Sequence, residues 1–152
     1  MSEQEVYTHK QLAVQAFNSV WDLIEKENRT KADEEEMIHM CHASFWHWTK
    51  VEDHTAANLS IGYWQLSRVY AISHNGAEAL SYAESCVDVS EGGELEPVLC
   101  GYAYEALARS LHVLGREGEA LEALKKAEVY KGRIADQESR NLLEADFATI
   151  TE

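Results

Sequence analysis

Residues 102–131 read YAYEALARSLHVLGREGEALEALKKAEVYK, and this stretch decides the fold. Its apolar residues recur every three or four positions on both sides of Gly115, as they do in two amphipathic helices joined by a tight turn. Small residues, Ala108 and Ala120, stand where the two helices would cross. Larger apolar residues fill the adjacent gaps: Tyr104, Leu111 and Leu124. The stretch therefore predicts an antiparallel helical hairpin.

The composition of the remaining chain also favours helices. Ala, Leu, Glu and other helix formers dominate the 152 residues, proline occurs once, and no run alternates apolar and polar residues as a β-strand does. We therefore expect a single all-α domain of about seven helices. The expected antiparallel helix pairs cover residues 5–50, 54–89 and 97–131, and a closing helix covers residues 137–150.

Capping and breaking residues mark the expected helix boundaries. The expected N-terminal caps are Thr30 with Asp33, Asp53, Asn75 with Glu78, and Asp136. Pro97 suits the first turn of the fifth helix, because its missing N–H needs no partner there. The longest break is residues 90–97, SEGGELEP. Most connections are short, so sequential helices should pack antiparallel.

The chain is strongly acidic, with 27 acidic and 13 basic side chains and a formal net charge of −14. An anionic surface repels phosphate backbones, and Lys125–Lys126 is the only adjacent basic pair, so we expect no nucleic-acid partner. No apolar run approaches membrane-spanning length, and residues 1–10, MSEQEVYTHK, lack the apolar core of a signal peptide. We therefore expect no membrane partner and a cytoplasmic location, where Cys41, Cys86 and Cys100 would be buried free thiols.

An internal repeat relates two parts of the chain at a spacing of 41 residues. The later segment carries Tyr104, Leu107, Ala108 and Leu111, followed across the turn by Ala120, Leu124 and Ala127. The matching positions of the earlier segment are Tyr63, Leu66, Ser67 and Tyr70, followed by Ala79, Ala83 and Cys86. The repeat predicts two helical hairpins of similar packing.

The later hairpin carries the helical-repeat pattern W-x2-L-G-x2-Y…A-x3-F as Tyr104-x2-Leu107-Ala108-x2-Leu111…Ala120-x3-Leu124. The chain therefore resembles the tetratricopeptide repeat family, from which it departs by Gly132 in place of the proline and by its longer repeat. The segments HASFWHW, SRVYA, AYEALAR and IADQESRNLL are also similar to small bacterial repeat proteins without an assigned function. The resemblance implies helix pairs stacked as a short right-handed superhelix with a concave groove.

The family generally binds peptides or protein surfaces in that groove, which implies a non-catalytic interaction scaffold without a cofactor. The groove-facing candidates implied by the resemblance are Trp64, Arg68, Tyr102, Glu105, Arg109 and His112. The partner would be a peptide, another protein or a second copy of the chain in a homodimer. Arginine suits a carboxylate partner, and the alternative is that Arg68 and Arg109 each pair with a neighbouring glutamate.

Histidines concentrate in the less regular half of the chain, between residues 39 and 74. Glu35, His39 and His42 share one stripe of the second expected helix, and Glu36-x2-His39 has the spacing used in di-iron bundles. The chain has one copy of that motif, so we expect no metal site there. His42, Trp46 and His47 could instead line an aromatic pocket against the third expected helix. The alternative function is a small metal- or ligand-binding helical enzyme that uses the Glu35/His39/His42 stripe.

Overall fold

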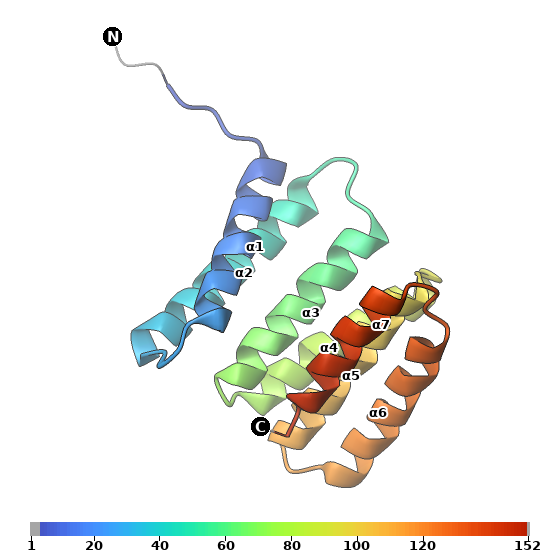
Figure 1. Cartoon of the computed structure of the whole chain (residues 1–152). Helices are drawn as coiled ribbons and strands as arrows, with labels where there is room; N and C mark the ends of the chain where they lie inside the picture. Colours follow the sequence, from blue (N-terminus) through green and yellow to red (C-terminus); the bar gives the residue numbers. More distant parts are fainter. Residues whose placement is uncertain (1–3, 152) are drawn as a thin grey trace. The chain divides into compact units, whose positions relative to one another are not determined.

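A computed structural model describes residues 4–151. These residues form seven helices and no strand, so the all-α prediction is confirmed (Figure 1). The helices are α1 (His9–Glu25), α2 (Lys31–Lys50), α3 (Ala56–Ile72), α4 (Gly76–Gly92), α5 (Pro97–Val113), α6 (Glu117–Gly132) and α7 (Gln137–Ala148). Within residues 4–151, no helix has the length and apolar character needed to cross a membrane.

The helices belong to two compact units, Met1–His54 and Thr55–Glu152. In the first unit α1 packs against α2. In the second unit α3 packs against α4 and α5, α5 also packs against α4 and α6, and α7 lies against α5 and α6. The two hairpins of the sequence repeat, α3–α4 and α5–α6, are therefore both present, and the closing helix completes the second unit.

Three helices begin with a capping box that uses threonine. Thr8, Thr30 and Thr55 cap α1, α2 and α3, and the side chain three residues later returns a hydrogen bond to the N-cap backbone. The prediction for Thr30 with Asp33 is confirmed. Asp53 was expected to cap α3 and does not, because Thr55 and Asn58 satisfy the backbone N–H groups at that helix start.

The start and end of α4 also differ from the sequence prediction. Asn75 precedes α4 but makes no side-chain cap hydrogen bond. At the other end α4 continues to Gly92, so the break covers only residues 93–96. Buried Ser90 explains the extension, because its Oγ lies 2.7 Å from Oγ of Ser60 on α3 and ties the last turn of α4 into the core. Asp136 caps α7 through the backbone N–H of Ser139, as predicted.

Small residues allow close helix contacts in both units. In the first unit, buried Ser44 of α2 donates a hydrogen bond of 2.8 Å to the carbonyl oxygen of Ala13 on α1. In the second unit, α5 and α6 share a core of buried alanines with two large side chains of α7; its members include Ala108, Ala120, Ala123, Ala127, Leu143 and Phe147. The predicted crossing residues Ala108 and Ala120 are both buried.

Gly101 sets the distance between α5 and α7. A Cβ atom placed on Gly101 would lie 2.8 Å from Cδ2 of Leu143, which is closer than side chains normally approach. Leu143 is completely buried. The glycine therefore lets α7 lie directly against α5 and brings the end of α7 to the side chains of the candidate site.

Candidate functional site

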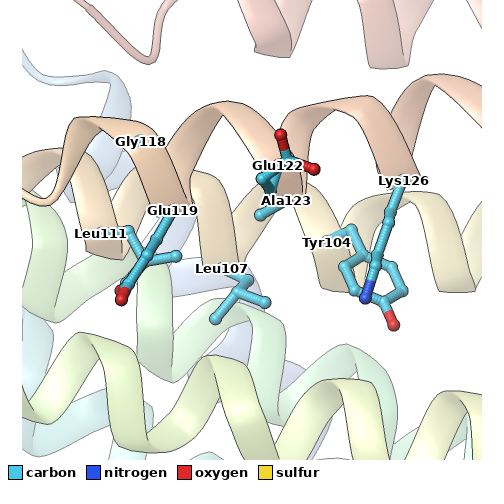
Figure 2. Close-up of a pocket in the computed structure, with 8 residues that line it drawn as sticks. All are labelled: Tyr104, Leu107, Leu111, Gly118, Glu119, Glu122, Ala123 and Lys126. Atoms are coloured by element: carbon cyan, nitrogen blue, oxygen red, sulfur yellow. The ribbon is translucent and has the colours of Figure 1, made fainter.

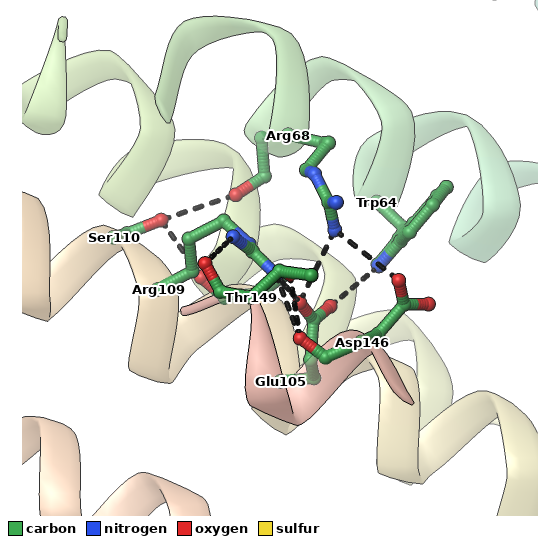
Figure 3. A network of polar contacts seen from close by, with 9 residues as sticks. Trp64, Arg68, Glu105, Arg109, Ser110, Asp146 and Thr149 are labelled. Atoms are coloured by element: carbon green, nitrogen blue, oxygen red, sulfur yellow. Dashed lines mark hydrogen bonds and ion pairs between the residues drawn. The ribbon is translucent and has the colours of Figure 1, made fainter. Parts of the chain in front are cut away.

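The candidate site lies on the face made by α3, α5 and α7. Trp64 and Glu105 are 41 residues apart, and Asp146 follows Glu105 by the same interval. Figure 3 shows that all three belong to one polar network, together with the arginines one turn after Trp64 and Glu105. The stacking of helices therefore brings equivalent positions of the repeat side by side.

Glu105 is the centre of the network. It is fully buried, yet it accepts hydrogen bonds from Trp64 Nε1 at 2.9 Å and from Arg109 Nε and Nη2 at 3.0 and 2.7 Å. Arg68 Nη1 lies 3.4 Å from the same carboxylate. A buried carboxylate is tolerated when its charge is paired and its lone pairs are occupied, and both conditions hold here.

Arg109 connects Glu105 to the end of α7. Its guanidinium donates to the carbonyl oxygens of Asp146 and Thr149, at 3.1 and 3.2 Å, and to Thr149 Oγ1 at 2.7 Å. These carbonyls belong to the last turn of α7 and to its C-cap residue, where the helix dipole favours a positive charge. One side chain therefore caps the closing helix and neutralises the buried glutamate.

Arg68 is held more loosely than Arg109. Its Nη1 lies 3.8 Å from Asp146 Oδ1, its guanidinium lies 6.0 Å from the centre of the Trp64 ring, and its buried Nε has no hydrogen-bond partner. Burial and the neighbouring Arg109 lower the pKa of Arg68, while Glu105 and Asp146 oppose that shift. Burial, followed by the charge of Glu105, raises the pKa of Asp146.

Apolar and aromatic side chains lie within one helical turn of the residues of this network. Tyr102 is half-buried and meets Trp64 edge to face, with ring centres 5.6 Å apart. Burial is the main cause that raises the pKa of Tyr102 to about 12, so its hydroxyl stays neutral. Ile61 precedes Trp64 by one turn and is 39% exposed, while Leu142 precedes Asp146 by one turn and is 59% exposed. We call Ile61, Trp64, Arg68, Tyr102, Leu142 and Asp146 the α3–α5–α7 face.

The structure brings most of the predicted groove residues together. Trp64, Arg68, Glu105 and Arg109 meet in the network, and Tyr102 lies beside it. The alternative prediction was that Arg68 and Arg109 each pair with a neighbouring glutamate. Both do pair with a glutamate, and it is the same residue, Glu105. Glu105 and Arg109 are buried, so they support the face from beneath. His112 lies apart, with Nδ1 2.8 Å from Glu117 Oε1 at the turn between α5 and α6. Asp146 and Thr149 were not predicted.

The histidine stripe of α2 is mostly exposed. Glu35, Glu36 and His39 are exposed and His42 is half-buried. Among residues 4–151 there is no group of three or more His, Cys, Asp or Glu side chains placed to hold a metal ion. Two members of the predicted aromatic pocket, Trp46 and His47, contact His9 of α1, a residue that sequence analysis did not select.

A hollow of about 460 Å³ lies on another side of the second unit, beside α6 (Figure 2). Its lining residues come from α5 and α6: Tyr104, Leu107, Leu111, Gly118, Glu119, Glu122, Ala123 and Lys126. Lys126 Nζ lies 5.4 Å from the centre of the Tyr104 ring. The hollow is thus an apolar surface with charged edges, and its residues include no nucleophile with a neighbouring base.

Tyr104 also belongs to a tyrosine–carboxylate cluster that joins α4, α5 and α6. Glu91 accepts hydrogen bonds of 2.7 Å from the hydroxyls of Tyr104 and Tyr130, whose rings stack 5.9 Å apart. The two hydrogen bonds lower the pKa of Glu91. Its carboxylate raises the pKa of Tyr130 to about 12. The cluster fixes the end of α4 against the next hairpin.

The cysteines are buried free thiols, as predicted. Burial raises the pKa of Cys41 far above its usual range and that of Cys86 to about 11. A thiol in this state is a poor nucleophile, because the reactive form is the thiolate. These two cysteines therefore act as small core residues.

Comparisons of the chain with protein-family models, with curated proteins and with solved structures find no match. Its function is therefore inferred from its own residues, and the α3–α5–α7 face is the site on which most of the predicted binding residues meet.

Proposed function

We propose that this chain is a non-catalytic, tetratricopeptide-like interaction module that binds a segment of a protein partner on the α3–α5–α7 face. The observation that carries the proposal is a pair of exposed apolar side chains, Ile61 on α3 and Leu142 on α7, each one helical turn from a residue of the polar network. Aromatic and aliphatic side chains grouped at a surface are typical of protein-binding sites.

The network beneath the face supports this proposal because it limits movement of the three helices. Glu105 joins α3 to α5 through Trp64 and Arg68, and Arg109 joins α5 to the end of α7. A face whose backbone is already fixed loses little conformational entropy when a partner binds. Affinity would come from the apolar side chains, and Arg68 would orient a polar group of the partner.

The partner is proposed to be a protein, either a different chain or a second copy of this one. The buried free cysteines fit a reducing compartment, so we expect the module to work in the cytoplasm. No contact among the described residues favours the alternative enzyme over binding. The role of the Glu35/His39/His42 stripe stays a prediction.

Charge substitutions on the face test this function. Ile61→Glu and Leu142→Glu place a carboxylate on the face, and Val129→Glu is the matched control, because Val129 is 56% exposed on α6. We expect affinity capture from the native host to recover a partner with the wild-type chain and with Val129→Glu, but not with either face variant. Light scattering of the purified chains shows whether the partner is a second copy.

Equal recovery of the partner by all three variants would place the binding surface elsewhere on the chain. Circular dichroism of each variant provides the folding control, since each substitution lies at an exposed position. Loss of binding in Val129→Glu as well would mean that added negative charge, and not the face, decides the result.

A further inference from the structure

His9 and His47 meet across the helix pair of the first unit. His9 is the first residue of α1, and His47 lies in the last turn of α2. Their Nδ1 atoms are 2.9 Å apart, and their ring centres are 5.2 Å apart. His9 is exposed and His47 is half-buried, so both rings are open to solvent. The two residues are 38 positions apart, so it is the fold that brings them together.

The contact between the two Nδ1 atoms constrains their protonation. At 2.9 Å one ring donates an N–H and the other accepts it, so the accepting ring is neutral. A neutral imidazole nitrogen is a good ligand for zinc, nickel and copper ions. A tetrahedral ion with metal–nitrogen bonds of about 2.0–2.1 Å holds two ligand nitrogens about 3.3 Å apart. To accept such an ion the two nitrogens must separate by about 0.4 Å, and the rings must rotate so that both Nδ1 lone pairs point at the ion.

We propose that His9 and His47 bind one divalent transition-metal ion, of the zinc, nickel or copper class, between the start of α1 and the end of α2. Both Nδ1 atoms become ligands, and water completes the coordination. The ring that donated the hydrogen bond moves its proton from Nδ1 to Nε2 by exchange with solvent. When both rings are neutral, the ion binds without net release of a proton.

The surroundings of the pair favour this site. Trp46 packs against both rings, with ring centres 5.6 Å from His9 and 5.0 Å from His47, so both histidines lie beside one indole. The net charge of −14 raises the concentration of cations around the chain. Because the described residues provide no group of three ligands, the ion keeps exchangeable water and binds more weakly than in a four-ligand structural site.

This site is separate from the histidine stripe considered above. The stripe uses residues of α2 alone, whereas the proposed pair joins both helices of the first unit. An ion bound only by the folded helix pair stabilises that pair, and the stabilisation grows with the logarithm of the free ion concentration once that exceeds the Kd. Metal binding and thermal stability should therefore change together.

Titration of the full-length, tag-free chain with zinc chloride and nickel chloride tests the proposal, with magnesium chloride as the control for nonspecific binding. We expect isothermal titration calorimetry to show one ion per chain for zinc and nickel. His9→Ala and His47→Ala should each weaken binding by about tenfold or more, because one of two ligands is lost. His39→Ala, an exposed histidine of α2, should bind as the wild type does.

Nuclear magnetic resonance of the wild-type imidazole signals gives a readout that requires no substitution. Zinc should shift the signals of His9 and His47 and leave that of His74 in place. The proposal is overturned by the absence of saturable binding up to about 1 mM metal, or by binding that survives both His9→Ala and His47→Ala. Binding lost in His39→Ala would place the ion on the stripe, and equal weakening in all three variants would indicate diffuse attraction to surface histidines; either result rejects the pair.

Discussion

Trp64 donates its indole N–H to Glu105 at 2.9 Å, and the two residues occupy the same position in successive repeats. This hydrogen bond joins α3 directly to α5 through two side chains. It also gives Glu105 a neutral donor in addition to its two arginines. The stability of the second unit should therefore depend strongly on this one carboxylate.

Replacement of Glu105 by glutamine should destabilise the chain strongly. The substitution keeps the size of the side chain but leaves buried Arg109 and half-buried Arg68 without the carboxylate that they share. Loss of one member of a buried ion pair costs roughly 3–5 kcal/mol of unfolding free energy. Urea denaturation followed by circular dichroism measures the change.

Asp146→Asn is the matched comparison for Glu105→Gln. The pKa of Asp146 is raised, so burial disfavours its charged form, and that cost grows as pH rises through the raised pKa. A neutral amide at this position should change the unfolding free energy by less than about 1 kcal/mol at pH 7. A large loss of stability in Asp146→Asn would show that its pairing with Arg68 matters more than its desolvation.

A methyl group at position 101 should push α7 away from α5. In Gly101→Ala the new Cβ would meet Leu143 at 2.8 Å, so we expect a loss of roughly 1–3 kcal/mol from overpacking. Gly118→Ala is the control, because a Cβ at this position would meet no side chain or other segment of the chain within 4 Å. Alanine is the better helix former, so that control should be neutral or more stable by up to about 1 kcal/mol. Thermal unfolding of both variants compares them directly.

The Glu91 cluster should make stability depend on pH at both ends of the scale. The pKa of Glu91 is lowered in the folded chain, so its contribution is present above the ordinary glutamate pKa and is lost as pH falls through the lowered value. The pKa of Tyr130 is raised to about 12, so its contribution is present below the ordinary tyrosine pKa and is lost as pH rises toward about 12.

Tyr130→Phe separates this effect from the general acid and alkaline unfolding of the protein. The variant keeps the ring that stacks on Tyr104 and removes only the hydroxyl. At pH 7 we expect it to lose roughly 0.5–1 kcal/mol, and its difference from the wild type should shrink at both extremes of pH. A difference that is constant from pH 3 to 11 would contradict the assigned hydrogen bond to Glu91.

The alanine at the crossing of α5 and α6 should not tolerate a larger side chain. Ala108 is 1% exposed within the shared core of the two helices. Ala108→Leu should therefore cost roughly 1–3 kcal/mol of unfolding free energy. Leu121, which is 54% exposed on α6, offers Leu121→Ala as a surface control that should change little. An unchanged midpoint for Ala108→Leu in denaturant would contradict close packing at this crossing.

Local sequence signals were sufficient to predict most of the fold. Thr30 and Asp136 form the expected caps because a cap depends on residues only three positions apart. The same reasoning selected Asp53 and not Thr55 as the cap of α3, because both residue types cap helices and the two lie close together. The capping box of Thr55 is also harder to recognise, because its N3 residue is Asn58 and not the usual glutamate or glutamine. The end of α4 could not be predicted, since it depends on the buried contact between Ser90 and Ser60.

The candidate site was predictable only in part, for a related reason. Arg109 and Glu105 are one helical turn apart, so their pairing follows from the sequence. Asp146 and Thr149 join them only because α7 lies against Gly101 of α5, a contact over about forty residues. His9 was not predicted as a site residue because no sequence motif includes it. Its partner, His47, lies 38 residues away in the last turn of α2, and only the fold brings the two together.

The charges of the polar network cancel, because Arg68 and Arg109 face Glu105 and Asp146. The whole formal charge of −14 therefore belongs to the other surfaces of the chain. Two molecules that approach through those surfaces repel each other, and added salt weakens the repulsion. An approach through the polar network, whose four charges balance, meets less of that repulsion. If the proposed partner is a second copy, the acidity of the molecule therefore favours the orientation in which the two α3–α5–α7 faces meet.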